Sequence, residues 1–265
     1  MAAGPATQQK SGASRSEGSP QRPSRPGTRN LRVPGPRALL IALAAFVLVA
    51  GGVWALYGSG WFRVEQVTTS GTRVLTPAEV ERVAAVPVGA PLVSVDTDAI
   101  EARLRERLPR IADVDVVRSW PHGIRLKVTE RRPVLLIEKG GKFDEVDSGA
   151  VRFATVPTPP AGVPRLVLDV AASPSLRRFD GERLLRAAVG VTGELPEKIA
   201  QDVRVVRIMS FDSITLELDE GRTVFWGSGE DGPVKARVLT ALMKATPKAG
   251  HFDVSAPTAP ASSGS

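Results

Sequence analysis

Large apolar side chains gather first in one uncharged block of the chain. Residues 38–57 read ALLIALAAFVLVAGGVWALY, and the stretch before them contains few large apolar side chains. A helix of this length rises about 30 Å, which matches the hydrocarbon thickness of a bilayer. Trp54 and Tyr57 stand at its far end, where amphipathic rings prefer the headgroup region. The pattern predicts one transmembrane helix over 38–57.

Residues 61–132 combine two amphipathic helices with three strands. One helix begins in TPAEVERVAAV, where Thr76 can cap the helix and Pro77 stands in the first turn. A second helix, VDTDAIEARLRERLP, carries Ile100 and Leu104 on one face. One strand precedes the helices and two strands follow them. This order favours a three-stranded sheet with both helices on one face.

Short strands dominate residues 133–256, which we predict to form a second domain. Ile214, Leu216 and Leu218 alternate with polar residues, and VRVVRIMS and RTVFWGS are predicted as neighbouring strands. Helices are predicted in DGERLLRAAVGVTGEL, with Leu184, Leu185, Ala188 and Val191 facing inward, and in PVKARVLTALMKA. Residues 257–265 are predicted to be a frayed tail. The fold class is therefore α+β, with a mixed α/β second domain whose sheet is mainly antiparallel.

Positive charge is concentrated in front of the apolar block. Residues 1–37 hold seven Lys or Arg side chains and one acid, and they are rich in Gly, Pro and Ser, so we predict a disordered basic tail. Cations that flank a span favour the cytoplasmic side. The tail is therefore expected in the cytoplasm and both domains outside, as in a single-pass type II protein. A cleaved signal peptide is disfavoured because the leader and the apolar stretch are both too long.

The rest of the chain is nearly neutral and contains no cysteine. No folded basic surface for nucleic acid is indicated, and disulfides, thiol nucleophiles and cysteine-ligated metals are excluded. His122, expected as an exposed turn residue, and His251 lie far apart without convergent partners for a base or metal site. The run DEVDS, 144–148, has valine where a calcium loop needs a ligand. We expect no catalysis, no cofactor, no metal and no small-molecule substrate.

One loop suggests a competing nucleotide-binding hypothesis. Residues 227–232 read GSGEDG between a predicted strand and a predicted helix, and Asp253 follows about twenty residues later, as in a dinucleotide-binding fingerprint. Glu230 and Asp231 would repel a pyrophosphate, Pro233 removes a backbone donor, and no further parallel strand is expected. An exported enzyme or nucleotide binder is therefore the rival class of function.

The segments together resemble the FtsQ/DivIB family of bacterial cell-division proteins. The resemblance runs from the basic tail and single span through a POTRA-like first domain to a β domain. It is carried by VEQVTTSG, VRSWPHGIRLKVTERRP, EVDSGAVRF, LELDEGRTVFWG before VKARVLTAL, and FDVSAP. It implies a non-catalytic scaffold in the bacterial cell membrane, at the division septum.

The resemblance also implies partners and a role. The implied partners are FtsB- and FtsL-like division proteins and other septal proteins, and the implied role is to help regulate septal peptidoglycan synthesis. A POTRA protein of outer-membrane assembly is disfavoured because no barrel-sized run of strands follows the first domain.

The longest shared motif supplies a structural signature, which consists of Trp120, Pro121, Gly123, Glu130, Arg131 and Pro133. The first three form a turn signal between two strands, and Trp120 is expected to pack over the sheet edge. Glu130 and Arg131 are expected to pair locally at the surface. Pro133 is expected to stop the ladder, so that this cluster sets the angle between the domains.

A first partner contact is hypothesised at the end of the second domain. A short edge strand at HFDVS can pair with an extended partner segment, and Phe252, Val254 and Ala256 are expected to flank that surface. In better-known members of the family a further strand receives the partner. Here Pro257 and Pro260 cannot donate to a ladder, which disfavours such a strand.

A second partner contact is hypothesised on the first domain. The domain follows the span with almost no linker, so it is expected close to the membrane. Arg73 and Arg82 are the residues expected to make this contact.

Overall fold

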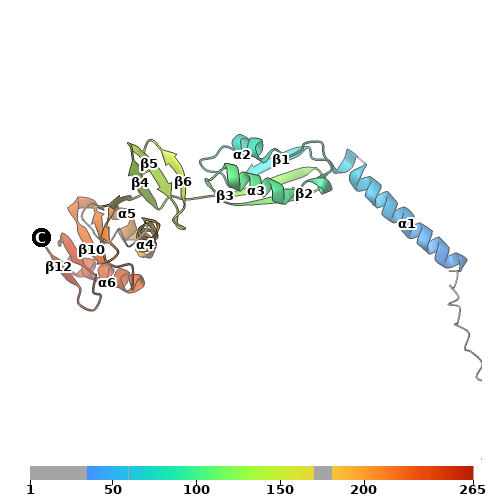
Figure 1. Ribbon diagram of the computed structural model, residues 1–265. Helices are drawn as coiled ribbons and strands as arrows, with labels where there is room; N and C mark the ends of the chain where they lie inside the picture. The colour runs from blue at the N-terminus through green and yellow to red at the C-terminus, as the bar shows by residue number, and fades with distance from the viewer. Residues whose placement is uncertain (1–34, 59, 170–180, 265) are drawn as a thin grey trace, which may run out of the picture. The chain divides into compact units, whose positions relative to one another are not determined.

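The computed structural model describes residues 35–58, 60–169 and 181–264. The predicted disordered tail lies almost wholly outside the described residues. Helix α1 (Pro36–Tyr57) covers the predicted span, and it is long and apolar enough to cross a membrane (Figure 1). None of its side chains is buried within the protein.

The first domain has the predicted order of strand, helix, helix, strand and strand (Figure 1). Its elements are η1 (Gly60–Phe62), β1 (Gln66–Ser70), α2 (Pro77–Ala84), η2 (Leu92–Ser94), α3 (Thr97–Arg107), β2 (Ile111–Ser119) and β3 (Gly123–Glu130). β3 is the central strand, parallel to β1 and antiparallel to β2. The sheet therefore has three strands, as predicted.

Local sequence explains the helices of the first domain. The Thr76 hydroxyl accepts a hydrogen bond from the Glu79 N–H at 3.2 Å, and the Asp96 carboxylate accepts one from the Ala99 N–H at 3.0 Å. Each cap satisfies an N–H group that has no partner inside the helix. Apolar residues of both helices then share one core with the inward face of β3. This core includes Val80, Ala84, Ile100, Leu104, Ile124, Leu126 and Val128.

The second domain is built on one mixed sheet. Its elements are β4 (Leu135–Lys139), β5 (Lys142–Val146), β6 (Arg152–Val156), β7 (Arg165–Leu168), α4 (Gly181–Glu194), α5 (Glu197–Asp202), β8 (Val203–Ser210), β9 (Ser213–Leu218), η4 (Asp219–Gly221), β10 (Thr223–Gly227), α6 (Gly232–Ala245), β11 (His251–Asp253) and β12 (Ala261–Ser263). The order of its nine strands is β12-β11-β10-β9-β8-β7-β4-β5-β6. Within the described residues most neighbouring pairs are antiparallel, whereas β4–β7, β7–β8 and β10–β11 are parallel. The predicted mixed, mainly antiparallel character is confirmed.

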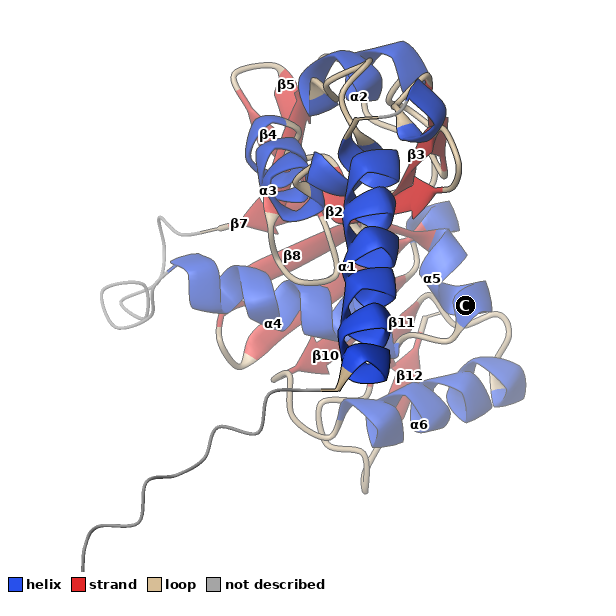
Figure 2. Cartoon of the chain, turned by 90° about the vertical axis from the view of Figure 1, so that its right-hand side faces the viewer, coloured by secondary structure: helices blue, strands red, loops and turns tan. Residues whose placement is uncertain are grey.

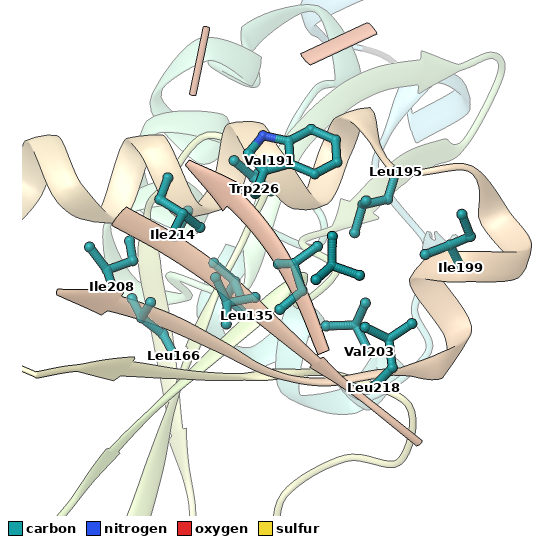
Figure 3. Packing of buried hydrophobic residues seen from close by; sticks show 14 of the residues in the cluster. Leu135, Leu166, Val191, Leu195, Ile199, Val203, Ile208, Ile214, Leu218 and Trp226 are labelled. Carbon is teal, nitrogen blue, oxygen red and sulfur yellow. The ribbon is translucent and has the colours of Figure 1, made fainter. Parts of the chain in front are cut away.

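Helices α4 and α6 pack against the sheet and complete the core of the second domain. α4 contacts β8 and α6, and α6 contacts β11 (Figure 2). The residues of α4 predicted to face inward are all buried, namely Leu184, Leu185, Ala188 and Val191. Figure 3 shows side chains from the helical side, including Val191 and Leu195, packed with strand residues that include Leu135 and Leu218. Trp226 is fully buried in this cluster.

The C-terminal segment forms a strand, which corrects the prediction of a frayed tail over 257–265. β12 pairs antiparallel with β11, and the Gly250 N–H donates to the Gly264 carbonyl at 3.1 Å. Pro257 and Pro260 precede the strand, where a missing donor interrupts no ladder. The unpaired side of β11 supplies a partner that the local sequence does not reveal.

Candidate partner-binding surface

The sheet of the second domain ends at β6 and β12, each with one paired neighbour in the described part of the chain. β6 carries Arg152 beside the buried Phe153, whereas β12 consists of Ala261, Ser262 and Ser263. Charged residues on an edge strand oppose the addition of a further strand, and small uncharged residues do not. β12 is therefore the better candidate for binding an extended segment of another protein.

Register determines which backbone groups of β12 point outward. Residues of an antiparallel strand point their N–H and C=O groups alternately toward and away from a given neighbour. The Val254 N–H donates to Phe225 of β10, so Phe252 and Val254 turn their backbone groups toward β10, and His251 and Asp253 turn theirs toward β12. The residues opposite them, Ser263 and Ala261, therefore face β11, and the backbone groups of Ser262 face away from it. These groups are the ones that an added strand would pair with.

The side chains predicted to flank this surface do not all lie there. Phe252 and Val254 are 1% and 0% exposed, so the prediction that they line a contact surface is wrong. The reason is that β11 is an inner strand, parallel to β10 on one side and covered by β12 on the other. Ala256 is exposed in the loop that leads to β12. Of the three predicted residues, only Ala256 can touch a partner directly.

Arg73 and Arg82 are both exposed, as a contact site requires. Arg82 lies in the last turn of α2. Arg73 lies beside the last residue of β3, Glu130, to which its backbone N–H donates at 2.7 Å. β1, in contrast, begins opposite Gly123, at the other end of β3. Arg73 is therefore at the end of the sheet remote from η1, because β1 carries the chain away from its point of entry.

The turn between β2 and β3 places Trp120 against Phe62 of η1. Its ring meets the Phe62 ring edge-on, with centroids 5.5 Å apart and an angle of 73° between the planes. This contact joins the turn to η1. His122 is half-buried rather than exposed, because its carbonyl accepts backbone hydrogen bonds from Glu65 and Gln66 and so joins the turn to the start of β1.

Glu130 performs a different task from the one predicted. Its carboxylate is 9% exposed and accepts backbone N–H groups of Arg73, Val74 and Leu75 at 2.7 to 3.2 Å. Charge-assisted hydrogen bonds of this kind are stronger than neutral ones. The predicted surface pair between Glu130 and Arg131 is therefore wrong, and Glu130 instead fastens the loop that joins β1 to α2.

Arg131 bonds to the second domain, together with a second arginine. Arg131 donates to the Asp147 carboxylate, and Arg110 donates to Glu145 at 2.6 Å. The Arg110 and Glu145 side chains are 14% and 6% exposed, and the Arg110 guanidinium lies 5.2 Å from the centre of the Phe153 ring. Arg131 of the signature motif and Arg110, which precedes β2, thus form charged contacts with the β5–β6 hairpin. The motif EVDSGAVRF contains the acidic partners Glu145 and Asp147. They lie far in sequence from the arginines that bind them, so the local sequence did not indicate these ion pairs.

The acidic run 144–148 comprises the end of β5 and the start of the turn to β6. One Asp147 carboxylate oxygen accepts the N–H groups of Gly149 and Val151, each at 2.9 Å. Across residues 35–58, 60–169 and 181–264 no group of three or more His, Asp or Glu side chains is placed to hold a metal ion. Pro133 stands between β3 and β4, where the ladder of β3 has already ended.

The GSGEDG loop, 227–232, does join a strand to a helix. β11 then pairs in parallel with β10, which corrects the expectation that no parallel strand follows. The start of α6 is closed, however. A Cβ atom at Gly232 would lie 1.4 Å from a Glu194 carboxylate oxygen, and the buried Lys235 ammonium donates to the Ser228 carbonyl at 2.9 Å. Protein side chains therefore occupy the position where a pyrophosphate would bind.

Burial controls the protonation of Glu194 and Lys235. Burial raises the pKa of Glu194, and the nearby Lys235 opposes this shift. Burial lowers the pKa of Lys235, and Asp231 and Glu230 oppose that shift. The sequence prediction missed both residues, because the end of α4 meets the start of α6 only in the folded domain.

Similarity to known proteins extends over the whole chain. The family described as POTRA domain, FtsQ-type, matches residues 62–131. The chain is 75% identical to "Cell division protein FtsQ" of Streptomyces venezuelae, with 100% of both chains covered. It is 60% identical to the protein of that name from Streptomyces coelicolor, covering 99% of this chain and 100% of the other. Identity to the Mycobacteroides abscessus protein is 32%, over 86% of this chain and 70% of the other.

One similar solved structure is the major extracytoplasmic domain of the trans isomer of the bacterial cell division protein DivIB from Geobacillus stearothermophilus. It is 14% identical and gives a TM-score of 0.34. The match covers 45% of this chain and 96% of that chain.

Replacing Glu130 with Ala is expected to destabilise the first domain. The three N–H groups that the carboxylate accepts would lose a charged partner, at a cost of roughly 1.5–3 kcal/mol in the free energy of unfolding. Chemical denaturation of the full chain in detergent, followed by circular dichroism, measures this loss. Glu106→Ala, at an exposed position of α3, is the control and should change stability by less than about 0.5 kcal/mol. Equal stabilities of the two variants would contradict the assigned role of Glu130.

Replacing Lys235 with Met is expected to destabilise the second domain. The apolar stem is retained, but the Ser228 carbonyl loses a charged donor and Glu194 loses a nearby cation, for a loss of roughly 1.5–3 kcal/mol. The control is Lys244→Met, on the exposed surface of the same helix. An equally small effect of both substitutions would show that the buried ammonium is not needed.

The effect of Lys235→Met is expected to decrease in acid. The pKa of Glu194 is raised in the folded protein, so the carboxyl takes up a proton there at a higher pH than in the unfolded chain. A neutral carboxyl no longer needs the cation, so the stability difference between the two proteins should shrink as pH falls through this raised pKa. Denaturation curves at several pH values test the sign, and a difference that grows in acid would contradict it.

Proposed function

We propose that this chain, which belongs to the FtsQ family of bacterial cell-division proteins, is a non-catalytic scaffold that binds small division proteins of the FtsB and FtsL kind at the septum. Its part in cell division follows from the family. The specific partners, the septal position and the regulation of septal peptidoglycan synthesis are the proposed elements. The observation that carries the proposal is the outward edge of β12 in the second domain.

The anchoring of the scaffold is supported by α1 and the charge around it. α1 is long enough for one bilayer crossing, and the basic residues of 1–37 precede it. This bias favours a cytoplasmic N-terminus, with both domains on the extracytoplasmic side. A partner anchored in the same membrane could then present its exported segment on the same side of the membrane as the second domain.

The rival function, an exported enzyme or nucleotide binder, receives less support. The start of α6 is closed by Glu194 and Lys235, so a phosphate would have to displace a carboxylate that is already enclosed. A strand edge needs no such rearrangement. Its backbone groups already point outward, and pairing by strand addition uses main-chain hydrogen bonds alone.

The β12 edge can be tested with a single backbone donor. Ser262→Pro removes an N–H that faces away from β11, whereas Ser262→Ala keeps this N–H and changes only the side chain. Loss of about 0.5–1.5 kcal/mol of binding free energy should weaken capture of the exported segment of the FtsB-like partner roughly two- to tenfold for the proline variant alone. Biolayer interferometry with the full chain in detergent measures the affinity.

Thermal unfolding of both Ser262 variants controls for damage to the fold. Deletion of residues 250–265 is less informative, because it also removes Phe252 and Val254 from the core. If the proline variant folds normally and binds the partner as well as the alanine variant does, β12 is not the docking edge.

The proposed second contact at Arg73 and Arg82 has a separate test. Arg73→Glu and Arg82→Glu reverse exposed charges and are expected to reduce recruitment of the fluorescently tagged protein to midcell. Arg237→Glu is the charge-matched control, at an exposed position of α6 in the second domain. Midcell fluorescence of both first-domain variants equal to that of the control would exclude these two arginines from the contact.

A further inference from the structure

Three segments that are distant in sequence meet where the chain enters the first domain. On one side of the entering segment 61–66, Val64 accepts a backbone hydrogen bond from Gly89 at 2.8 Å, in the loop before η2. On the other side, the N–H of Glu65 donates to the carbonyl of His122 at 2.8 Å. The β2–β3 turn and the loop before η2 are therefore fastened to the first residues of the domain.

Aromatic side chains are exposed at this junction. The Trp61 and Trp120 side chains are 79% and 51% exposed, and the Trp120 ring packs edge-on against Phe62. Trp61, Phe62, Pro121 and His122 line a shallow cavity of about 280 Å³. We call the surface formed by Trp61, Phe62, Trp120 and Pro121 the entry patch. Large rings are usually buried in a soluble domain, so their exposure together points to a partner.

The covalent chain restricts where the entry patch can be. α1 ends at Tyr57, and Trp61 follows four residues later. Even if this connection were fully extended, the backbone distance from Tyr57 to Trp61 could not exceed about 14 Å. The headgroup layer on each side of the hydrocarbon is roughly 5–8 Å thick. Trp120 stays close to this segment because its ring packs against Phe62, with the ring centroids 5.5 Å apart. Wherever the domain turns about its tether, the patch stays within reach of the membrane surface.

We propose that the entry patch lies in the headgroup region of the extracytoplasmic leaflet, so that lipid is its partner. This inference rests on the proposed anchoring of the chain by α1. Indole rings favour this region because their apolar body can contact acyl chains while their N–H group stays in contact with polar headgroups or water. Arg125, an exposed residue whose guanidinium lies 3.5 Å from the Ser119 hydroxyl beside Trp120, supplies a cation for lipid phosphates.

The contact gives the first domain a second attachment to the membrane. A single covalent tether leaves a domain free to rotate, whereas a tether and an adsorbed aromatic patch together restrict that rotation. The polypeptide would then present Arg73 and the β3 end of the sheet on the side remote from lipid, since the entry patch and Glu130 lie at opposite ends of β3. The remote end would remain open to other division proteins.

The four tryptophans of the chain allow a test in the native sequence. The full-length protein, labelled with 5-fluorotryptophan, is reconstituted in phosphatidylcholine nanodiscs with or without a lipid that carries a spin label on its headgroup. The four fluorine signals are assigned by single Trp→Phe variants. Trp54 lies in α1 and reports on anchoring, whereas Trp226 is fully buried in the second domain and is the internal control.

The proposal expects the spin-labelled lipid to broaden the signals of Trp61, Trp120 and Trp54 and to leave that of Trp226 sharp. Broadening of Trp54 without broadening of Trp120 would overturn the lipid contact and leave the anchoring intact. No broadening at Trp54 with acyl-chain or headgroup labels would overturn the proposed anchoring, and this inference with it. If the Trp120 signal is not broadened by the spin-labelled lipid but shifts when two copies share one nanodisc, the patch would be assigned to self-association instead.

Discussion

The short covalent connection between α1 and the first domain is the constraint on which the functional interpretation depends. α1 ends at Tyr57, and η1 already belongs to the folded domain at Gly60. Because so few residues separate a membrane-length helix from a packed sheet, that sheet cannot work far from the lipid surface. The same constraint gives the exposed rings of Trp61 and Trp120 a reason to be exposed.

Buried charge organises the signature motif at the end of β3. Glu130 turns inward to hold the loop at residues 73–75, while Arg131 reaches Asp147 in the second domain. Arg110 forms a further pair with Glu145, which lies two residues before Asp147. Pairs of this kind contribute little net stability compared with apolar residues of equal volume, but removing one member leaves an uncompensated charge. Their value is that they specify one arrangement of the connected chain segments.

At one end of the sheet in the second domain, one strand contributes to the core and the next strand provides an edge that a partner can reach. β11 places Phe252 and Val254 in the core and receives β12 on its open side. β12 then leaves small, uncharged residues at the border of the sheet. The proposed binding by strand addition needs such a border, since an edge strand can accept a partner only if its outward groups are not already paired.

The sequence by itself determined α1, the order of strands and helices in the first domain and the inward face of α4, through its periodicity and its capping residues. These features depend on residues within one or two turns of each other, so local side chains are sufficient to specify them. The tertiary structure alone decided that Glu130 is buried, that Glu194 closes the start of α6, and that β12 exists at all. Each depends on a contact between segments far apart in the chain, and a short segment carries no record of the partner that will satisfy its backbone or its charge.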